Sequence, residues 1–342
     1  MKKISLLIIV LFALSSCEKL LMPIGKKHSV SQIFDDLWKT MDQGYAYFDE
    51  KKLPWGDSLR ADYQFRLYDT MTDEQFFDTC AKFIAMFQDE NISLNAGFRT
   101  YRYNPRVKEP ANFNRSLLER KYLANAQHTG PFWHTVIDSV AYIYYEDFNR
   151  QVTDEHLDIL LRQFRDSTLF LYGVVFDVRN NAGGNPENMF PILKRMGVDT
   201  SFRYNTLLYK TVYKNGPAQN EFTDLQGAFI EQSPGAKFPE NFVLLTNKGT
   251  KGIGNIFAVS CRAFSNVRIM GDSTGGGIGF STGRELPNGW ILEYPSLKVF
   301  DSENEPTYYG IAPDDSVHMN RVDEDNDIDT IIETAIRRIK TI

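Results

Sequence analysis

Apolar residues recur at helical spacing in the first third of the chain. Ile33, Leu37 and Met41 stand four residues apart, which places them on one face of a helix. A second stripe of the same kind consists of Phe76, Phe77, Cys80, Phe83, Ile84 and Phe87. Thr72, three residues before a glutamine, has the pattern of a capping box that begins this second helix. Residues 31–97 are therefore predicted to form a small helical domain.

From residue 139 the pattern changes to short runs rich in β-branched and aromatic residues. Four runs are predicted strands: 140–145, 169–178, 202–213 and 242–246. Helical spacing between and after them predicts helices at 153–165, 187–196, 252–264 and 326–340. Strands that alternate with helices predict an α/β layer architecture for residues 139–342. Residues 98–138 show little periodicity and are predicted to be a long connection with a short helix at 115–123.

Composition narrows the class of protein. The 342 residues are 42% hydrophobic and 24% charged, with 14 Pro and 23 Gly, which excludes disorder, collagen and a polytopic membrane protein. A net charge of -6 gives no sign of a nucleic-acid partner. The aromatic content of 13% predicts a large core or an aromatic-lined groove. Cys80 and Cys261 lie in apolar helical stretches and are predicted to be buried thiols.

The first residues look like a targeting segment. Lys2 and Lys3 precede an apolar run that is too short to span a bilayer. The string Leu-Ser-Ser that ends at Cys17 resembles the lipobox of bacterial lipoproteins. This resemblance implies a signal peptide at 1–16, an acylated Cys17, a tether at 17–30 and a lipid-anchored protein of the cell envelope. An ordinary secretory signal with a chance cysteine stays open.

The acidic run at 323–329 has some features of a calcium loop. It lacks glycine at the sixth position, which is Ile328, and glutamate at the twelfth, which is Thr334. We therefore interpret it as the acidic N-terminus of the last helix. The sequence predicts no metal site and no cofactor.

Three glycine-rich loops follow predicted strands, at 177–185, 246–255 and 271–279. Such loops expose backbone N–H groups that a ligand or a reacting oxygen can approach closely. None contains the Gly-x-x-x-x-Gly-Lys-Ser/Thr string of a phosphate loop, and the full dinucleotide fingerprint is missing as well.

Taken together, these loops resemble the S41 family of serine peptidases, which includes tail-specific, C-terminal processing and tricorn-like proteases. The matching strings are Asp177-Val-Arg-Asn-Asn-Ala-Gly-Gly, Leu245-Thr-Asn, Gly271-Asp-Ser-Thr-Gly-Gly-Gly, Leu286-Pro-Asn-Gly-Trp and Gly310-Ile-Ala-Pro-Asp. The segment from Phe34-Asp-Asp-Leu-Trp to Tyr45-Ala-Tyr-Phe-Asp is similar too, so the likeness covers about residues 31–335. It implies a helical N-terminal domain and a ClpP/crotonase-like core of stacked ββα units. The PDZ domain of many members is not recognisable.

The resemblance also implies where catalytic residues belong. The family's serine falls on Gly252, and the histidine of tricorn-like members falls on Asn91. The lysine of processing proteases falls on Gly277, and an orienting glutamate falls on Tyr308. No proton-transfer group is left at these positions, because glycine has no side chain and an amide is no base near neutral pH. We therefore predict that no catalytic residue is intact.

The backbone loops of the family site are better retained. The oxyanion loop corresponds to Ala182, Gly183 and Gly184, with alanine in place of the first family glycine. Further ligand-binding loop positions are Gly252, Ile253, Gly254, Gly275 and Gly276. We expect unpaired N–H groups of Gly252, Gly254 and the oxyanion loop, with charge from Lys248 or Lys251, to bind the C-terminal carboxylate of a peptide.

Three hypotheses about function follow. The first is an envelope lipoprotein that is a pseudopeptidase and binds peptide or protein segments without cleaving them. The second is an active S41-type serine endopeptidase with a non-standard nucleophile, for which Thr250 and Ser260 are the nearest hydroxyls. The third is a carbohydrate-binding envelope lipoprotein that uses its aromatic residues. The sequence does not decide the oligomeric state.

Overall fold

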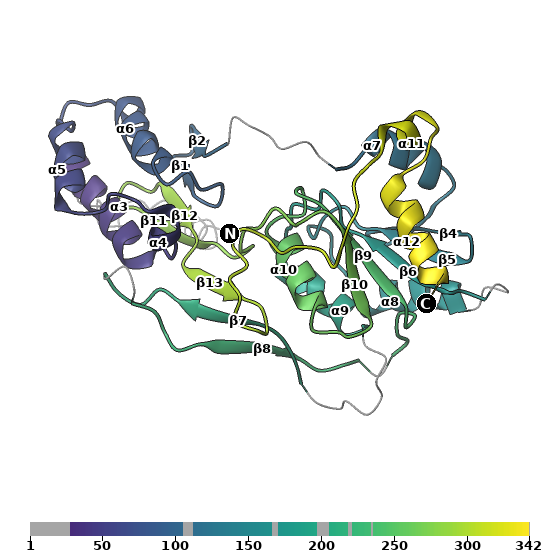
Figure 1. The fold of residues 1–342 in the computed structure, drawn as a ribbon. Helices are drawn as coiled ribbons and strands as arrows, with labels where there is room; N and C mark the ends of the chain where they lie inside the picture. Colours follow the sequence, from purple (N-terminus) through teal and green to yellow (C-terminus); the bar gives the residue numbers. More distant parts are fainter. Residues whose placement is uncertain are drawn as a thin grey trace, which may run out of the picture.

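Helices and short strands from residues 30–102, together with strands from residues 282–294, build one lobe, and a mixed sheet with its helices builds the other (Figure 1). The computed structural model describes residues 28–104, 112–165, 170–196, 205–217, 221–233 and 235–341. The predicted signal peptide, Cys17 and most of the tether lie outside these residues. Within the described residues, no helix is long and apolar enough to cross a membrane.

The N-terminal lobe contains the predicted helices. They are α3 (Val30–Gly44), α4 (Phe48–Lys51), α5 (Asp57–Phe65) and α6 (Asp73–Ala85). Capping boxes at Ser29 and Thr72 begin α3 and α6, because each side chain accepts from a backbone N–H three residues later. The apolar faces of these helices pack an aromatic core in which Phe83 contacts Phe34, Trp38 and Tyr63.

A small antiparallel sheet completes this lobe. Its order is β11-β12-β1-β2, with β11 (Thr282–Glu285), β12 (Ile291–Tyr294), β1 (Ser93–Asn95) and β2 (Thr100–Arg102). Residues 98–138, which we predicted to be a long connection with one short helix, have more structure. It contains β2, α7 (Arg115–Leu117), the π-helical turn η1 (Leu118–Tyr122), β3 (Gln127–Thr129) and β4 (Phe132–Ile137). The helical turn at 115–123 is confirmed.

The second lobe is an α/β layer structure, as predicted. Its sheet has the order β14-β10-β9-β6-β5-β4-β3. The strands not yet given are β5 (Val140–Tyr144), β6 (Gly173–Asp177), β9 (Phe242–Thr246), β10 (Val267–Gly271) and β14 (Asp315–Ser316). Strands β5, β6, β9, β10 and β14 run parallel. Every residue of β5, β6 and β9 is buried, because both faces of the sheet are covered.

Helices cover the two faces of this sheet. The faces carry α8 (Asp154–Arg165), α9 (Met189–Leu193) and α10 (Ile253–Cys261) on one side and α12 (Thr330–Lys340) on the other. The predicted helix at 187–196 begins instead as a 3-10 turn, Pro186–Asn188. The helix predicted at 326–340 is α12, which begins at Thr330, and a separate short helix, α11 (Arg321–Asp325), precedes it. Asp329 caps α12, so the acidic run does begin the last helix. Cys80 and Cys261 are buried, as predicted.

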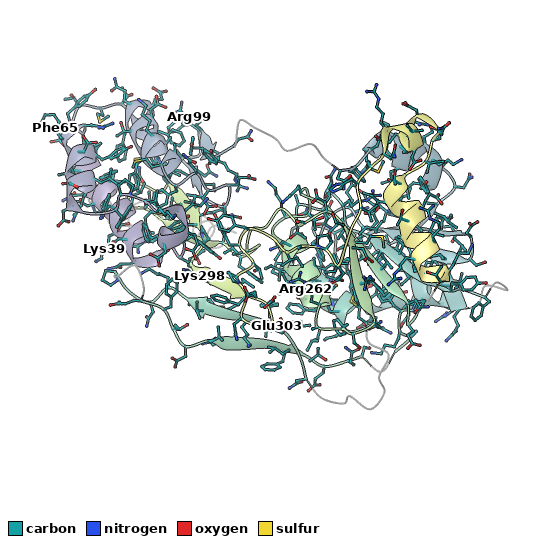
Figure 2. The ribbon with its side chains drawn as sticks, viewed as in Figure 1. Lys39, Phe65, Arg99, Arg262, Lys298 and Glu303 are labelled. Carbon is teal, nitrogen blue, oxygen red and sulfur yellow. The ribbon has the colours of Figure 1, made fainter. Side chains whose placement is uncertain are left out.

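A third sheet connects the two lobes. Its order is β13-β7-β8, with β13 (Leu297–Phe300), β7 (Thr206–Tyr213) and β8 (Gln226–Ile230). Lys298 of β13 lies between the lobes (Figure 2), where its ammonium is 2.8 Å from the Glu50 carboxylate. The Lys298 ammonium lies 5.9 Å from the centre of the Tyr47 ring, and this ring stacks on that of Tyr308 with centroids 4.0 Å apart. These contacts hold the N-terminal lobe against the α/β lobe.

Candidate functional site

The three glycine-rich loops meet at one edge of the large sheet. Strands β6, β9 and β10 are parallel neighbours, and they end at Asp177, Thr246 and Gly271. Each loop starts at one of these ends. The carboxyl edge of a parallel sheet is the usual position of a ligand site in α/β proteins.

A buried ion cluster anchors the first loop. The Arg179 guanidinium is fully buried and lies 2.7 Å from Asp177 and 3.0 Å from Asp329, the cap of α12. The Tyr142 hydroxyl also donates to Asp177 (2.7 Å). This cluster fixes the loop to the last helix, because each buried charge has an opposite charge as its partner.

Polar side chains join the second loop to the first. The Asn247 carboxamide accepts from the N–H of Asn180 (2.8 Å) and donates to its side chain (2.9 Å). The Thr250 hydroxyl is buried and donates to the carbonyl of Val178 (2.8 Å). The Ser260 hydroxyl is also buried, inside α10, and donates to the carbonyl of Ile256 (2.8 Å). Both hydroxyls therefore have structural roles.

A groove of about 740 Å³ lies between the glycine loops and the N-terminal lobe. The N-terminal lobe contributes Lys51, Gln88, Asp89, Glu90, Asn91, Thr100, Arg102, Tyr103 and Asn104. The α/β lobe contributes Ala182, Lys251, Gly252, Gly275, Gly276, Gly277, Tyr308 and Tyr309. All four positions at which the family resemblance implies a catalytic residue thus line one groove. Among these lining residues there is no serine, cysteine or histidine.

Gly252 lies in a half-buried turn directly before α10. Its φ of 56° and ψ of -123° lie in a region that glycine adopts far more readily than other residues. A Cβ built on it would lie 3.1 Å from the carbonyl oxygen of Ala182 and no closer than 3.7 Å to Gly279. The position could therefore hold a small side chain, yet glycine leaves it without a nucleophile.

Gly277 lies between Gly252 and Asn91. A Cβ built on Gly277 would be 3.6 Å from the Gly252 Cα and 3.5 Å from the Asn91 Oδ1. A side chain at position 277 would therefore begin in the space between Gly252 and Asn91. The structure therefore brings the implied nucleophile and both implied base positions to one point.

Asp89 organises the neighbourhood of Asn91, although we did not single it out from the sequence. Its carboxylate accepts from the Asn91 N–H (2.9 Å), from the Asn91 side chain (2.8 Å) and from the Tyr45 hydroxyl (2.8 Å). Burial, and then Asp89, raise the pKa of Tyr308 well above its ordinary value. Tyr308 is thus a neutral hydrogen-bond donor, in the position where the resemblance implies a carboxylate.

Three N–H groups of the expected array are already hydrogen-bonded. The Gly252 N–H donates to Gly276 (2.9 Å), and the Gly254 N–H donates to Lys251 (2.9 Å). The Gly183 N–H donates to the Asn181 side chain (2.9 Å). Our expectation that the N–H groups of Gly252, Gly254 and the oxyanion-loop residue Gly183 are unpaired is therefore wrong at these three positions, because each donates within or between the loops. Binding of a peptide carboxylate stays a prediction.

Other predicted loop residues lie behind the groove. A Cβ on Gly183 would be 2.7 Å from the Ile253 nitrogen, and one on Gly184 would be 2.6 Å from the Phe148 backbone. These glycines allow close packing of loops and do not line the groove. Lys248 is also absent from the lining, whereas Lys251 lines it and pairs with Glu90.

Lys51 is a groove residue that the sequence analysis missed. It ends α4, a helix of four residues that carries no recognisable motif. Burial lowers its pKa, while Asp89 and Glu90 have the opposite effect. No local signal marks this lysine, because only the docking of the two lobes places it in the groove.

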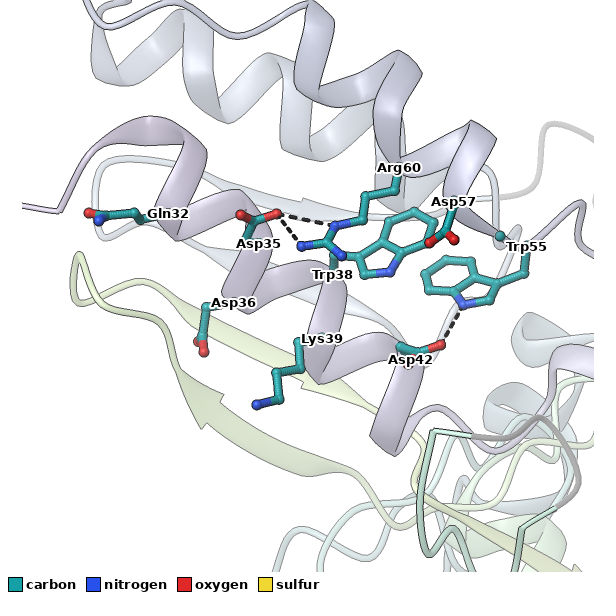
Figure 3. Close-up of a pocket in the computed structure, with 10 residues that line it drawn as sticks. Gln32, Asp35, Asp36, Trp38, Lys39, Asp42, Trp55, Asp57 and Arg60 are labelled. Carbon is teal, nitrogen blue, oxygen red and sulfur yellow. Dashed lines mark hydrogen bonds and ion pairs between the residues drawn. The ribbon is translucent and has the colours of Figure 1, made fainter.

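A second pocket, of about 460 Å³, lies between α3 and α5 (Figure 3). Three of its four carboxylates have partners: Asp35 pairs with Arg60 (2.8 Å), Asp36 pairs with Arg284 (3.0 Å), and Asp42 accepts from the Trp55 indole (2.7 Å). The rings of Trp38 and Trp55 stack on each other with centroids 3.9 Å apart. The Asp35–Arg60 pair holds α5 on α3. Because the two tryptophan rings stack on each other, their contacting faces are not available to a sugar.

Comparisons with known proteins agree with this architecture. A structure of a protein from Parabacteroides merdae ATCC 43184, assigned as a peptidase, is 30% identical, has a TM-score of 0.80, and the match covers 92% of this chain and 97% of that one. The photosystem II D1 C-terminal processing protease is 15% identical, with a TM-score of 0.55 and coverage of 85% and 93%. Mature CPAF complexed with lactacystin is 10% identical, with a TM-score of 0.61 and coverage of 92% and 98%. The last two likenesses show the fold alone. No curated protein sequence matches.

Sequence profiles give the family. Residues 27–85 match the Tricorn protease C1 domain. Residues 139–317, more than half of the chain, match Peptidase family S41 and include all three glycine loops. Together with the 30% identity across nearly the whole chain, this shows that the protein belongs to peptidase family S41.

Proposed function

We propose that this protein is a pseudopeptidase, which keeps the S41 groove and binds peptide segments in it without cleaving them. The observation that carries this proposal is the chemistry of the groove. Gly252 stands where the family has its nucleophile, and no serine, cysteine or histidine is among the described residues that line the groove. Acyl transfer needs a nucleophile with a base within hydrogen-bond reach.

The alternative of a substitute nucleophile finds little support. Thr250 and Ser260 are buried and donate to backbone carbonyls. Thr100 is the one aliphatic hydroxyl among the described lining residues, and it is exposed on β2 with no histidine in the groove to activate it. The N–H groups of Gly183 and Gly252 are already bonded, so these donors are not free to stabilise an oxyanion.

The free edge of β2 offers a place for an extended peptide. Ala96 donates to the carbonyl of Arg99 across the β1–β2 turn. Because bonded and non-bonded pairs alternate in an antiparallel ladder, the backbone groups of Thr100 and Arg102 point away from β1. Thr100 and Arg102 line the groove, and Tyr101 does not. A peptide that adds to this edge as a strand would thus lie in the groove.

Binding and cleavage can be tested in one experiment. Purified protein is incubated with pooled random decapeptides, bound peptides are recovered by gel filtration, and all peptides are read by mass spectrometry. We expect retained, uncut peptides. Thr100→Pro removes the edge N–H and is expected to abolish retention, whereas the matched variant Thr100→Ala keeps it. Cleavage products in the wild type, or no retention at all, would overturn the proposal.

We further propose that a lipid on Cys17 holds the protein in the cell envelope. The support is the basic start, the short apolar run and the small residues before this cysteine. Acyl chains of this kind bind a membrane durably when two or more are present. The groove would then bind peptide or protein segments close to that membrane.

A further inference from the structure

Lys51 has unused hydrogen-bonding capacity inside the groove. Its ammonium donates to the carbonyl of Gln88 (2.9 Å) and lies 5.3 Å from the centre of the Tyr308 ring. An ammonium carries three donors, so two remain. In the part of the chain that the structure describes, no carboxylate lies within ion-pair distance of Lys51.

The other cations of the groove are engaged. Lys251 pairs with Glu90 (3.0 Å), and Arg102 lies 3.5 Å from Glu293. The Asp89 carboxylate is only 1% exposed and receives hydrogen bonds from Tyr45, Asn91 and Tyr308. Among the described residues that line the groove, Lys51 is therefore the cation that has no carboxylate within ion-pair distance.

The surroundings of Lys51 favour an anionic guest. The side chain is partly buried, and this burial lowers its pKa because the ammonium has lost part of its hydration, a loss that the nearby Asp89 and Glu90 offset only in part. A carboxylate that enters the groove would restore that lost interaction with a charge-assisted hydrogen bond. Tyr309, which is 65% exposed and packs edge-on against Tyr308, offers an apolar face beside it.

We infer that the Lys51 ammonium binds a carboxylate of the peptide that occupies the groove, an inference that rests on the proposed peptide binding. The carboxylate is either the peptide's C-terminus or an Asp or Glu side chain, since both present the same chemistry. The carboxylate would then be bound on the N-terminal lobe, away from the Gly252 and Gly254 N–H groups, which are already bonded.

The test uses four pools of fluorescent decapeptides with random flanking positions. The pools combine a free or amidated C-terminus with a central Glu or Gln, and binding is measured by fluorescence anisotropy. We expect the wild type to bind carboxylate-bearing pools about tenfold more tightly than the neutral pool. The comparison of free with amidated pools identifies a C-terminal carboxylate, and Glu with Gln identifies a side chain.

Variants assign the effect to Lys51. Lys51→Met is expected to remove the preference, and Lys51→Arg to retain most of it. Lys52→Met, which removes an exposed neighbouring charge outside the groove lining, is expected to change nothing. Equal binding of all pools by the wild type, or an unchanged preference in Lys51→Met, would overturn this inference and leave peptide binding intact. No binding of any pool would overturn the proposed function as well.

Discussion

The carbonyl oxygen of Ala182 lies 3.1 Å from the point where Gly252 would carry a Cβ. The nucleophile position of the family therefore has room for a small side chain, at the cost of a positive φ. A non-glycine residue in such a conformation costs on the order of 1–2 kcal/mol.

We expect Gly252→Ser to fold, to lose about 1–2 kcal/mol of stability and to stay inactive. The new hydroxyl would lack a base, because Asn91 cannot take a proton near neutral pH. Urea unfolding measures the loss, and a fluorophosphonate probe measures reactivity. Strong labelling of this single variant would show that another group in the groove acts as a base.

Adding Asn91→His to Gly252→Ser is expected to produce labelling at position 252. The Asn91 side-chain nitrogen already donates to Asp89 (2.8 Å), so a ring N–H at this position has an acceptor that orients it. The matched control is Asn91→His alone, which should not label. Equal, background labelling in all three variants would mean that the loop geometry is also incompetent.

The helical and parallel-strand parts of the fold could be predicted because their periodicity is strong. Strand β9 and helix α8 match their predicted limits within one residue. The β11-β12-β1-β2 sheet could not be predicted, because it joins strands of three or four residues that are almost 200 positions apart. Every residue of strand β11 is exposed, so its sequence has no alternation of apolar and polar residues that would predict a strand.

The candidate site also has a part that could be predicted from the sequence and a part that could not. Family spacing locates Gly252, Asn91, Gly277 and Tyr308, and the structure places all four in one groove. The spacing does not reveal that Gly276 accepts the Gly252 N–H, since this bond depends on how two loops pack. Lys51 and Asp89 enter the groove only when the lobes dock.

Arg179→Met is expected to destabilise the protein by about 3–5 kcal/mol, because it leaves Asp177 and Asp329 buried without their cation. The matched variant Arg268→Met removes a partly exposed pair with Asp315 and should cost no more than about 1 kcal/mol. Urea unfolding of both variants measures the two losses of stability. Similar losses in the two would show that the Arg179 cluster does not anchor the loop.

Stability is expected to fall as the pH drops from about 6.5 to 4. Burial, with a smaller effect of His128, lowers the pKa of His134 to about 4. Between these values the unfolded chain binds a proton at His134 and the folded protein does not, so acid favours unfolding by at most about 3 kcal/mol. His134→Gln is expected to reduce this dependence of stability on pH, whereas the control His318→Gln, at an exposed histidine, is expected to leave it unchanged. Urea unfolding midpoints measured at several pH values test both.

Cys17→Ala is expected to abolish incorporation of an alkyne fatty acid and to release the protein from the membrane fraction. The matched variant Ser16→Ala keeps the cysteine and should still be labelled. Fatty-acid labelling of Cys17→Ala at the wild-type level would refute the lipid anchor.

The most direct test of a catalytically vacant groove is labelling of the wild-type protein with a fluorophosphonate probe, beside an active S41 peptidase as the positive control. Modified residues are mapped by mass spectrometry. A loss of nucleophile and base lowers triad chemistry by about 10⁴- to 10⁶-fold, so we expect no labelled residue in the wild type. Stoichiometric labelling of Thr100, Thr250 or Ser260 would contradict this account.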